Sequence, residues 1–162
     1  MGAVLVLAGL AACGSSGVAQ HAPVTIAPQT PQVPSLTTIR TEYGWAVSYL
    51  NSAATSFKTE LDDAMRTKDG QVLYGACQGL AGALLSFDVS ASAIKYPIAL
   101  KNQVHSMLAA DAALEKDLQA IGSAALNSWL SKWRSDVVTA QTMHDGVTHP
   151  LGLPDDRFLT II

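Results

Sequence analysis

The sequence contains few charged residues, and the first of them is Arg40. Asp, Glu, Lys and Arg together make up 14% of the 162 residues, well below the ~25% that is usual in soluble domains. The formal net charge is −3, and no cluster of Lys and Arg forms a basic patch. This charge pattern excludes nucleic acid as an expected partner.

Motifs that identify common enzymes are also missing. There is no glycine-rich phosphate loop, no nucleophile elbow, and no Glu-x-x-His motif of the kind that builds metal centres in helical bundles. Glutamate occurs only at positions 42, 60 and 115, and none of the three has a histidine three residues later. The sequence therefore predicts no cofactor and favours a protein that is not an enzyme.

Long hydrophobic runs are absent apart from a short one at the start of the chain. The uncharged segment 3–12 is far below the ~20 residues that a membrane-spanning helix needs, but its length fits the apolar region of a signal peptide. It ends in Leu10-Ala11-Ala12-Cys13, which resembles the lipobox of bacterial lipoproteins. The resemblance implies a signal peptide at 1–12, a lipid on the Cys13 thiol, and an extracytoplasmic domain anchored to the cell membrane.

The segment before the apolar run lacks the positive charge with which signal peptides begin. We therefore expect the true start of the protein to lie upstream of Met1. An ordinary secretory signal, cleaved near Ala19, is the alternative, and in that case Cys13 is discarded with it.

A proline-rich stretch follows the lipobox. Segment 13–34 has no charged residue and contains four prolines, which favour extended polyproline II backbone. We interpret it as a tether that holds the domain away from a membrane surface. The prolines are Pro23, Pro28, Pro31 and Pro34.

From residue 35 onward apolar residues recur at helical spacing. The pattern predicts four helices, at about 36–67, 71–87, 97–121 and 123–146, separated by Gly-containing or Pro-containing connections. Short connections between amphipathic helices favour an all-α, up-down-up-down antiparallel four-helix bundle over 35–162, with an irregular C-terminal tail. Glycines at 75, 79 and 82 predict that another helix of the same domain packs closely against the second helix.

Two residue groups stand out as candidate binding sites. Trp45 and Tyr49 lie on the face of the first helix opposite its apolar stripe, where two rigid aromatic side chains can form a contact patch for a partner in the cell envelope. A C-terminal tail that folds over them is the alternative. His144, Asp145 and His149 form the only local cluster of metal-ligand types, and His105 is a possible addition.

Two further residues lie on apolar stripes. Asp111 falls near the middle of the stripe of the third helix, so we expect it to be buried with a partner or to mark a cleft. Arg40 and Lys58 are its candidate partners. Cys77 falls on the stripe of the second helix, which predicts an unreactive buried thiol.

The sequence thus predicts a lipid-anchored, non-catalytic binding or scaffolding domain. A metal-binding or sensing lipoprotein is the first alternative, and an enzyme with Asp111 in a cleft of the bundle is the second.

Overall fold

The computed structural model describes residues 34–122, 125–154 and 156. The signal peptide, Cys13 and nearly all of the tether lie outside these residues. The described part contains four α-helices and two short 3₁₀ turns. The helices are α1 (Leu36–Thr67), α2 (Gly70–Ala93), α3 (Lys101–Gln119) and α4 (Leu126–Leu151), and the turns are η1 (Ile98–Leu100) and η2 (Ala120–Gly122).

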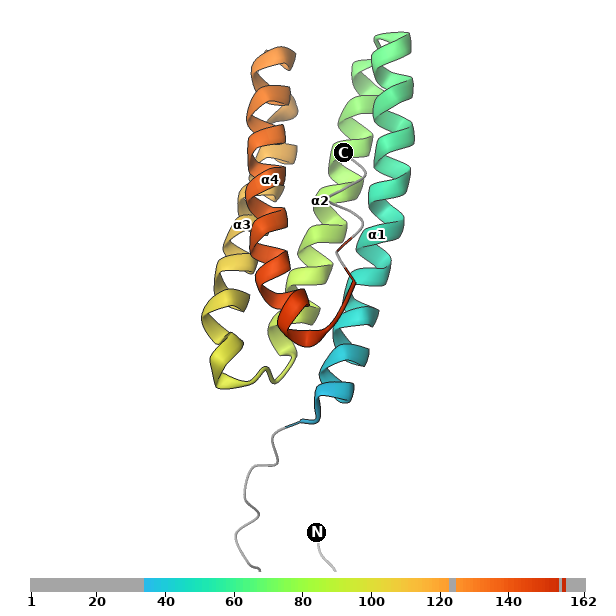
Figure 1. Ribbon diagram of the computed structural model, residues 1–162. Helices are drawn as coiled ribbons and strands as arrows, with labels where there is room; N and C mark the ends of the chain where they lie inside the picture. Colours follow the sequence, from blue (N-terminus) through green and yellow to red (C-terminus); the bar gives the residue numbers. More distant parts are fainter. Residues whose placement is uncertain (1–33, 123–124, 155, 157–162) are drawn as a thin grey trace, which may run out of the picture. The chain divides into compact units, whose positions relative to one another are not determined.

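These helices form the antiparallel up-down-up-down bundle that the sequence predicts (Figure 1). Helix α1 packs mainly on α2, α3 packs on both α2 and α4, and α1 and α4 meet directly at only a few residues. The bundle therefore consists of two helical hairpins that are joined along α2 and α3.

The start and end of α1 follow from its sequence. Ser35 is the N-cap, and its hydroxyl accepts a hydrogen bond from the backbone N–H of Thr38, which satisfies one of the free donors of the first turn. The helix ends where Lys68 adopts a left-handed backbone. Gly70 falls between the predicted ranges 36–67 and 71–87, but it is the first residue of α2, and the Asp69 carboxylate caps that helix.

Helix α2 is longer than predicted and continues through Ser90 to Ala93. Its last turn stays helical because Ala91 and Ile94 are buried there, and burial outweighs the weak helix propensity of the serines. Within the described residues, α2 is also the one helix long and apolar enough to cross a membrane. Leu73, Leu80, Leu84 and Phe87 of this helix lie in the core of the bundle, whereas Leu85 and Val89 are exposed.

The prediction for the glycines of α2 is wrong. Gly75, Gly79 and Gly82 lie on the exposed face of the helix, and a Cβ atom on any of them would meet nothing within 4 Å. No described helix packs against them, since the buried face of α2 is formed by other residues that are spaced to face the core.

Helix α4 also continues beyond its predicted end near Gly146. Val147, Thr148 and Leu151 are buried in the additional turn, and Pro150 is accommodated close to the C-terminus. A helical glycine costs only about 1 kcal/mol relative to alanine, which the burial of Val147 and Leu151 offsets. Gly152, with a left-handed backbone (φ 64°), ends the helix instead.

Candidate functional site

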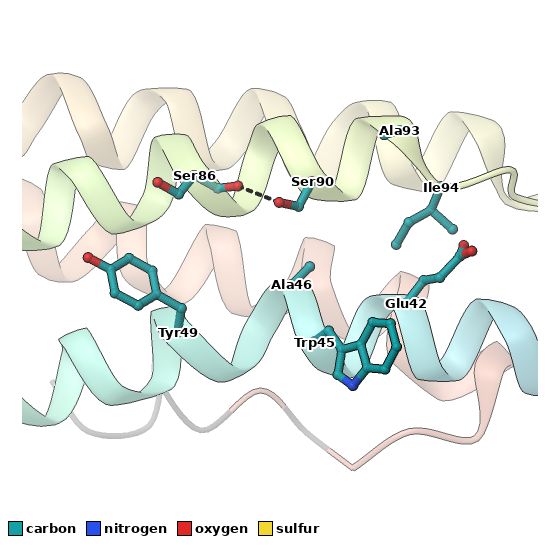
Figure 2. A pocket seen from close by; sticks show the side chains of 8 residues that line it. All are labelled: Glu42, Trp45, Ala46, Tyr49, Ser86, Ser90, Ala93 and Ile94. Atoms are coloured by element: carbon teal, nitrogen blue, oxygen red, sulfur yellow. Dashed lines mark hydrogen bonds between the residues drawn. The ribbon is translucent and has the colours of Figure 1, made fainter.

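A groove on the surface between α1 and α2 contains the two predicted aromatic residues. Trp45 and Tyr49 expose 74% and 61% of their surface, so both lie on the outer face of α1 as the sequence predicts. They line a groove of about 420 Å³ together with residues of both helices (Figure 2). The other lining residues are Glu42, Ala46, Ser86, Ser90, Ala93 and Ile94.

A second hollow continues this groove along the same two helices. It has a volume of about 240 Å³ and shares Tyr49 with the first. Glu60 lies at its far end, and Gly79 of α2 contributes to its lining. The two hollows extend from Glu42 to Glu60, which at 1.5 Å per residue is about 27 Å along α1. Of the residues that the structure describes, no Lys or Arg lines either hollow.

A second feature is a fully buried polar cluster around His144. The Nε2 atom of His144 lies 2.9 Å from Oδ1 and 3.0 Å from Oδ2 of Asp111, on α3. The Nδ1 atom lies 2.6 Å from Oδ2 of Asp156, beyond the end of α4. Tyr43, on α1, donates a hydrogen bond of 2.6 Å to the same Asp156 oxygen. The cluster therefore connects three helices and the C-terminal segment.

The electrostatics of the cluster favour a charged imidazole. Burial opposes a positive charge on His144, but the Asp111 and Asp156 carboxylates outweigh it and raise its pKa to about 9. Both ring N–H groups then donate to carboxylates. Burial and the Asp156 carboxylate also raise the pKa of Tyr43 far above its usual value, so its hydroxyl remains a donor.

Asp88 of α2 lies beside this cluster. Burial and the adjacent Asp111 carboxylate raise the pKa of Asp88 to about 8, so near neutral pH it is mostly uncharged. Phe87, also on α2, contacts two rings of the cluster. Phe87 stacks on the His144 ring at 5.5 Å between ring centres, and Tyr43 meets Phe87 edge-on at 5.7 Å.

The structure confirms that Asp111 is buried with a partner, but the partner is neither Arg40 nor Lys58. Asp111 has no exposed surface and pairs with His144. Arg40 instead donates through Nε to the carbonyl oxygen of Leu151 at the end of α4. Asp111 lines none of the grooves described above, so the geometry gives no support to a substrate cleft at this residue.

The three residues of the predicted metal cluster lie in different surroundings, and Asp145 is half-buried. His144 is fully buried, with its two ring nitrogens directed at Asp111 and Asp156, whereas His149 is exposed. Among residues 34–122, 125–154 and 156, no group of three or more His, Cys, Asp or Glu side chains is arranged to hold a metal ion.

Cys77 is buried in the core and is not in a disulfide. Burial raises the pKa of its thiol to about 12, so almost none of the reactive thiolate is present near neutral pH. This agrees with the unreactive thiol that the sequence predicts, while the predicted lipidation site, Cys13, lies outside the described residues.

Sequence reasoning missed Tyr43, Asp88 and Asp156 as members of the buried cluster. Tyr43 lies on the apolar stripe of α1, a position that is typical of an ordinary core residue. Asp156 lies in a tail without periodicity, so no pattern indicates its burial. Asp111 was the one available signal, because a buried carboxylate requires a donor nearby.

Comparisons with protein-family models, with curated proteins and with solved structures gave no match to this chain.

Proposed function

We propose that this protein is a lipid-anchored extracytoplasmic bundle that binds a partner protein, without catalysis, through the groove between α1 and α2. The observation that carries the proposal is the exposure of Trp45 and Tyr49 along this groove. Aromatic side chains of this kind are enriched among the residues that dominate binding energy at protein interfaces.

The lining of the groove indicates the chemistry of the partner. Aromatic and apolar side chains share the lining with serines, and the carboxylates of Glu42 and Glu60 lie toward the two ends. Among the described residues, the lining contains no Lys or Arg. A length of about 27 Å corresponds to roughly 18 residues of helix. These features suit an amphipathic helix of the partner that carries an apolar stripe with Lys or Arg toward its ends.

The anchor is supported by the sequence alone. The Leu10-Ala11-Ala12-Cys13 motif resembles a lipobox, and the uncharged, proline-rich segment after it is suited to separate a bundle from a membrane surface. A domain held at a membrane in this way meets its partners in the cell envelope.

Co-purification from native membranes tests the groove. A variant with both Trp45→Ala and Tyr49→Ala removes the exposed rings, and we expect it to lose the partner that wild-type protein retains while its thermal unfolding changes little. Tyr74→Ala is the matched control, because Tyr74 is a half-exposed tyrosine on α2 that lines neither hollow. Equal recovery of partners by the double variant and the wild type would contradict the proposal.

A further inference from the structure

The segment after α4 connects two helices that otherwise have little contact. Gly152, Leu153, Pro154 and Asp156, which we call the strap, lead from the end of α4 toward α1 (Figure 1). Asp156 is 4% exposed and accepts hydrogen bonds from Tyr43 on α1 and from His144 on α4. The strap is therefore hydrogen-bonded to both α1 and α4, two helices that have few direct contacts with each other.

A second contact strengthens the same end. Arg40, near the start of α1, donates to the Leu151 carbonyl at the last turn of α4. Its guanidinium group also lies close to Gly152, since a Cβ atom on that glycine would be 2.9 Å from Nη2. The turn that begins the strap is thus fixed by a side chain of α1.

Farther along, the α1–α4 side of the bundle is hollowed. A groove of about 270 Å³ lies between Phe57, Leu61 and Met65 of α1 and Leu130 and Arg134 of α4. The opposite side differs, because α2 packs extensively on α3. The two hairpins are therefore joined closely along α2–α3 and meet at fewer residues along α1–α4. There the strap adds to two direct contacts between the helices, the buried Phe57–Trp133 ring pair and the hydrogen bond between Tyr43 and His144.

Separation of α1 from α4 would recover hydration free energy of the buried charges. The closed form buries an imidazolium and two carboxylates, and the removal of charges from water costs several kcal/mol per ion before their attraction is counted. Water that reached His144, Asp111 and Asp156 would recover part of that cost. The difference in free energy between a closed and an open α1–α4 side is correspondingly reduced.

We infer that the strap is a clasp whose release opens the bundle along α1–α4, while each hairpin stays folded and the α2–α3 contact acts as the hinge. Release brings the buried Asp111–His144 pair into contact with solvent. The clasp is independent of the proposed binding groove, which lies on the α1–α2 side.

Amide hydrogen exchange of the full-length protein, read by NMR, tests the clasp. Tyr43→Phe removes one hydrogen bond to Asp156 and keeps the ring that packs on Phe87. Because a hydrogen bond to a charged group contributes about 1.5–3 kcal/mol, we expect exchange at least about tenfold faster at the amides of Gly152 and Leu153, which bond to the last turn of α4. Amides near Ile39 on α1 should accelerate with them, and those of Leu84 on α2 and Leu114 on α3 should change less than about twofold.

A second variant and a control complete the experiment. Asp156→Asn keeps the size of the side chain and removes its charge, and it should accelerate the same amides. Tyr74→Phe removes an exposed hydroxyl of α2 and should change nothing. Unchanged exchange at Gly152 and Leu153 in Tyr43→Phe would overturn the inference, as would an equal acceleration in all four helices.

Discussion

His144 is the residue on which the buried cluster depends. It donates to two carboxylates from different parts of the chain, Asp111 and Asp156. Each of these carboxylates is buried, and an unpaired buried charge is far more costly than an unpaired exposed one. Loss of the imidazole therefore affects both at once.

We predict that His144→Gln lowers the free energy of unfolding by about 3–5 kcal/mol, which is the usual effect when one partner of a buried ion pair is removed. Urea unfolding followed by circular dichroism measures it. His105→Gln is the matched control, because His105 is exposed on α3, and its effect should stay within about 0.5 kcal/mol. Similar effects of the two substitutions would contradict the role given to His144.

The same residue makes stability depend on pH. The pKa of His144 is raised to about 9 in the folded protein from about 6.5 in an unfolded chain. Its contribution is therefore complete below pH 6.5 and is lost as the pH rises through 9. Asp88, whose pKa is raised to about 8, acts in the same direction between about pH 4 and pH 8, since the folded state again binds the proton more tightly.

We predict that the free energy of unfolding falls from pH 6 to pH 9.5, with a loss on the order of 3 kcal/mol from His144 alone. Urea unfolding across this range measures it. In His144→Gln the part of the loss that belongs to His144 should disappear. A wild-type stability that is constant or rises over the range would be the opposite result.

At the scale of the helices, glycine has two different roles. Gly152 ends α4 with a left-handed backbone, where a Cβ atom would lie 2.9 Å from Nη2 of Arg40. Gly75 lies in the interior of α2 with open space around it. The same substitution should therefore have opposite effects at the two positions.

We predict that Gly152→Ala lowers the free energy of unfolding by about 1–2 kcal/mol, the cost of a left-handed backbone for a residue with a Cβ atom. Gly75→Ala should raise it by up to about 1 kcal/mol, because alanine is the better helix former. Thermal unfolding of both variants checks the pair. A loss of stability in Gly75→Ala would mean that the exposed face of α2 is in contact with something.

The elements illustrate what the sequence can predict. The apolar spacing was sufficient to predict four helices, because helical periodicity repeats over many residues, and the short connections predicted their antiparallel order. It placed the end of α4 too early, since the local signal of Gly146 and Pro150 was outweighed by the burial of Val147 and Leu151. The pairing of Asp111 with His144 depends on which helix faces which, and this is a tertiary property that local spacing does not contain.

The candidate binding groove was predictable only in part. The helical angle of Trp45 and Tyr49 was enough to place both on the outside of α1. The opposite wall, formed by Ser86 and Ser90, depends on how α2 packs beside α1. The apolar pattern of one helix predicts which way a side chain on it points, but it does not predict which residues of a neighbouring helix lie beside that side chain.

At the scale of the whole molecule, the proposed anchor is a prediction about location. We predict that Cys13→Ser moves the protein from the membrane fraction to the soluble fraction, because without the thiol no lipid can be attached. Cell fractionation followed by intact-mass analysis of the mature protein checks it, and Cys77→Ser is the control that should stay at the membrane. An unlipidated wild-type chain that begins near residue 20 would support simple secretion instead.

The central claim, that the groove between α1 and α2 binds a partner helix, is tested most directly by photo-crosslinking in intact cells. A photoreactive phenylalanine analogue replaces Tyr49 in one variant and Tyr74 in another, and both tyrosines lie on the surface. We predict a discrete adduct with one protein from position 49, and peptide mapping that places the crosslink on an amphipathic helix of that protein. No adduct from position 49, or the same adduct from both positions, would contradict the account.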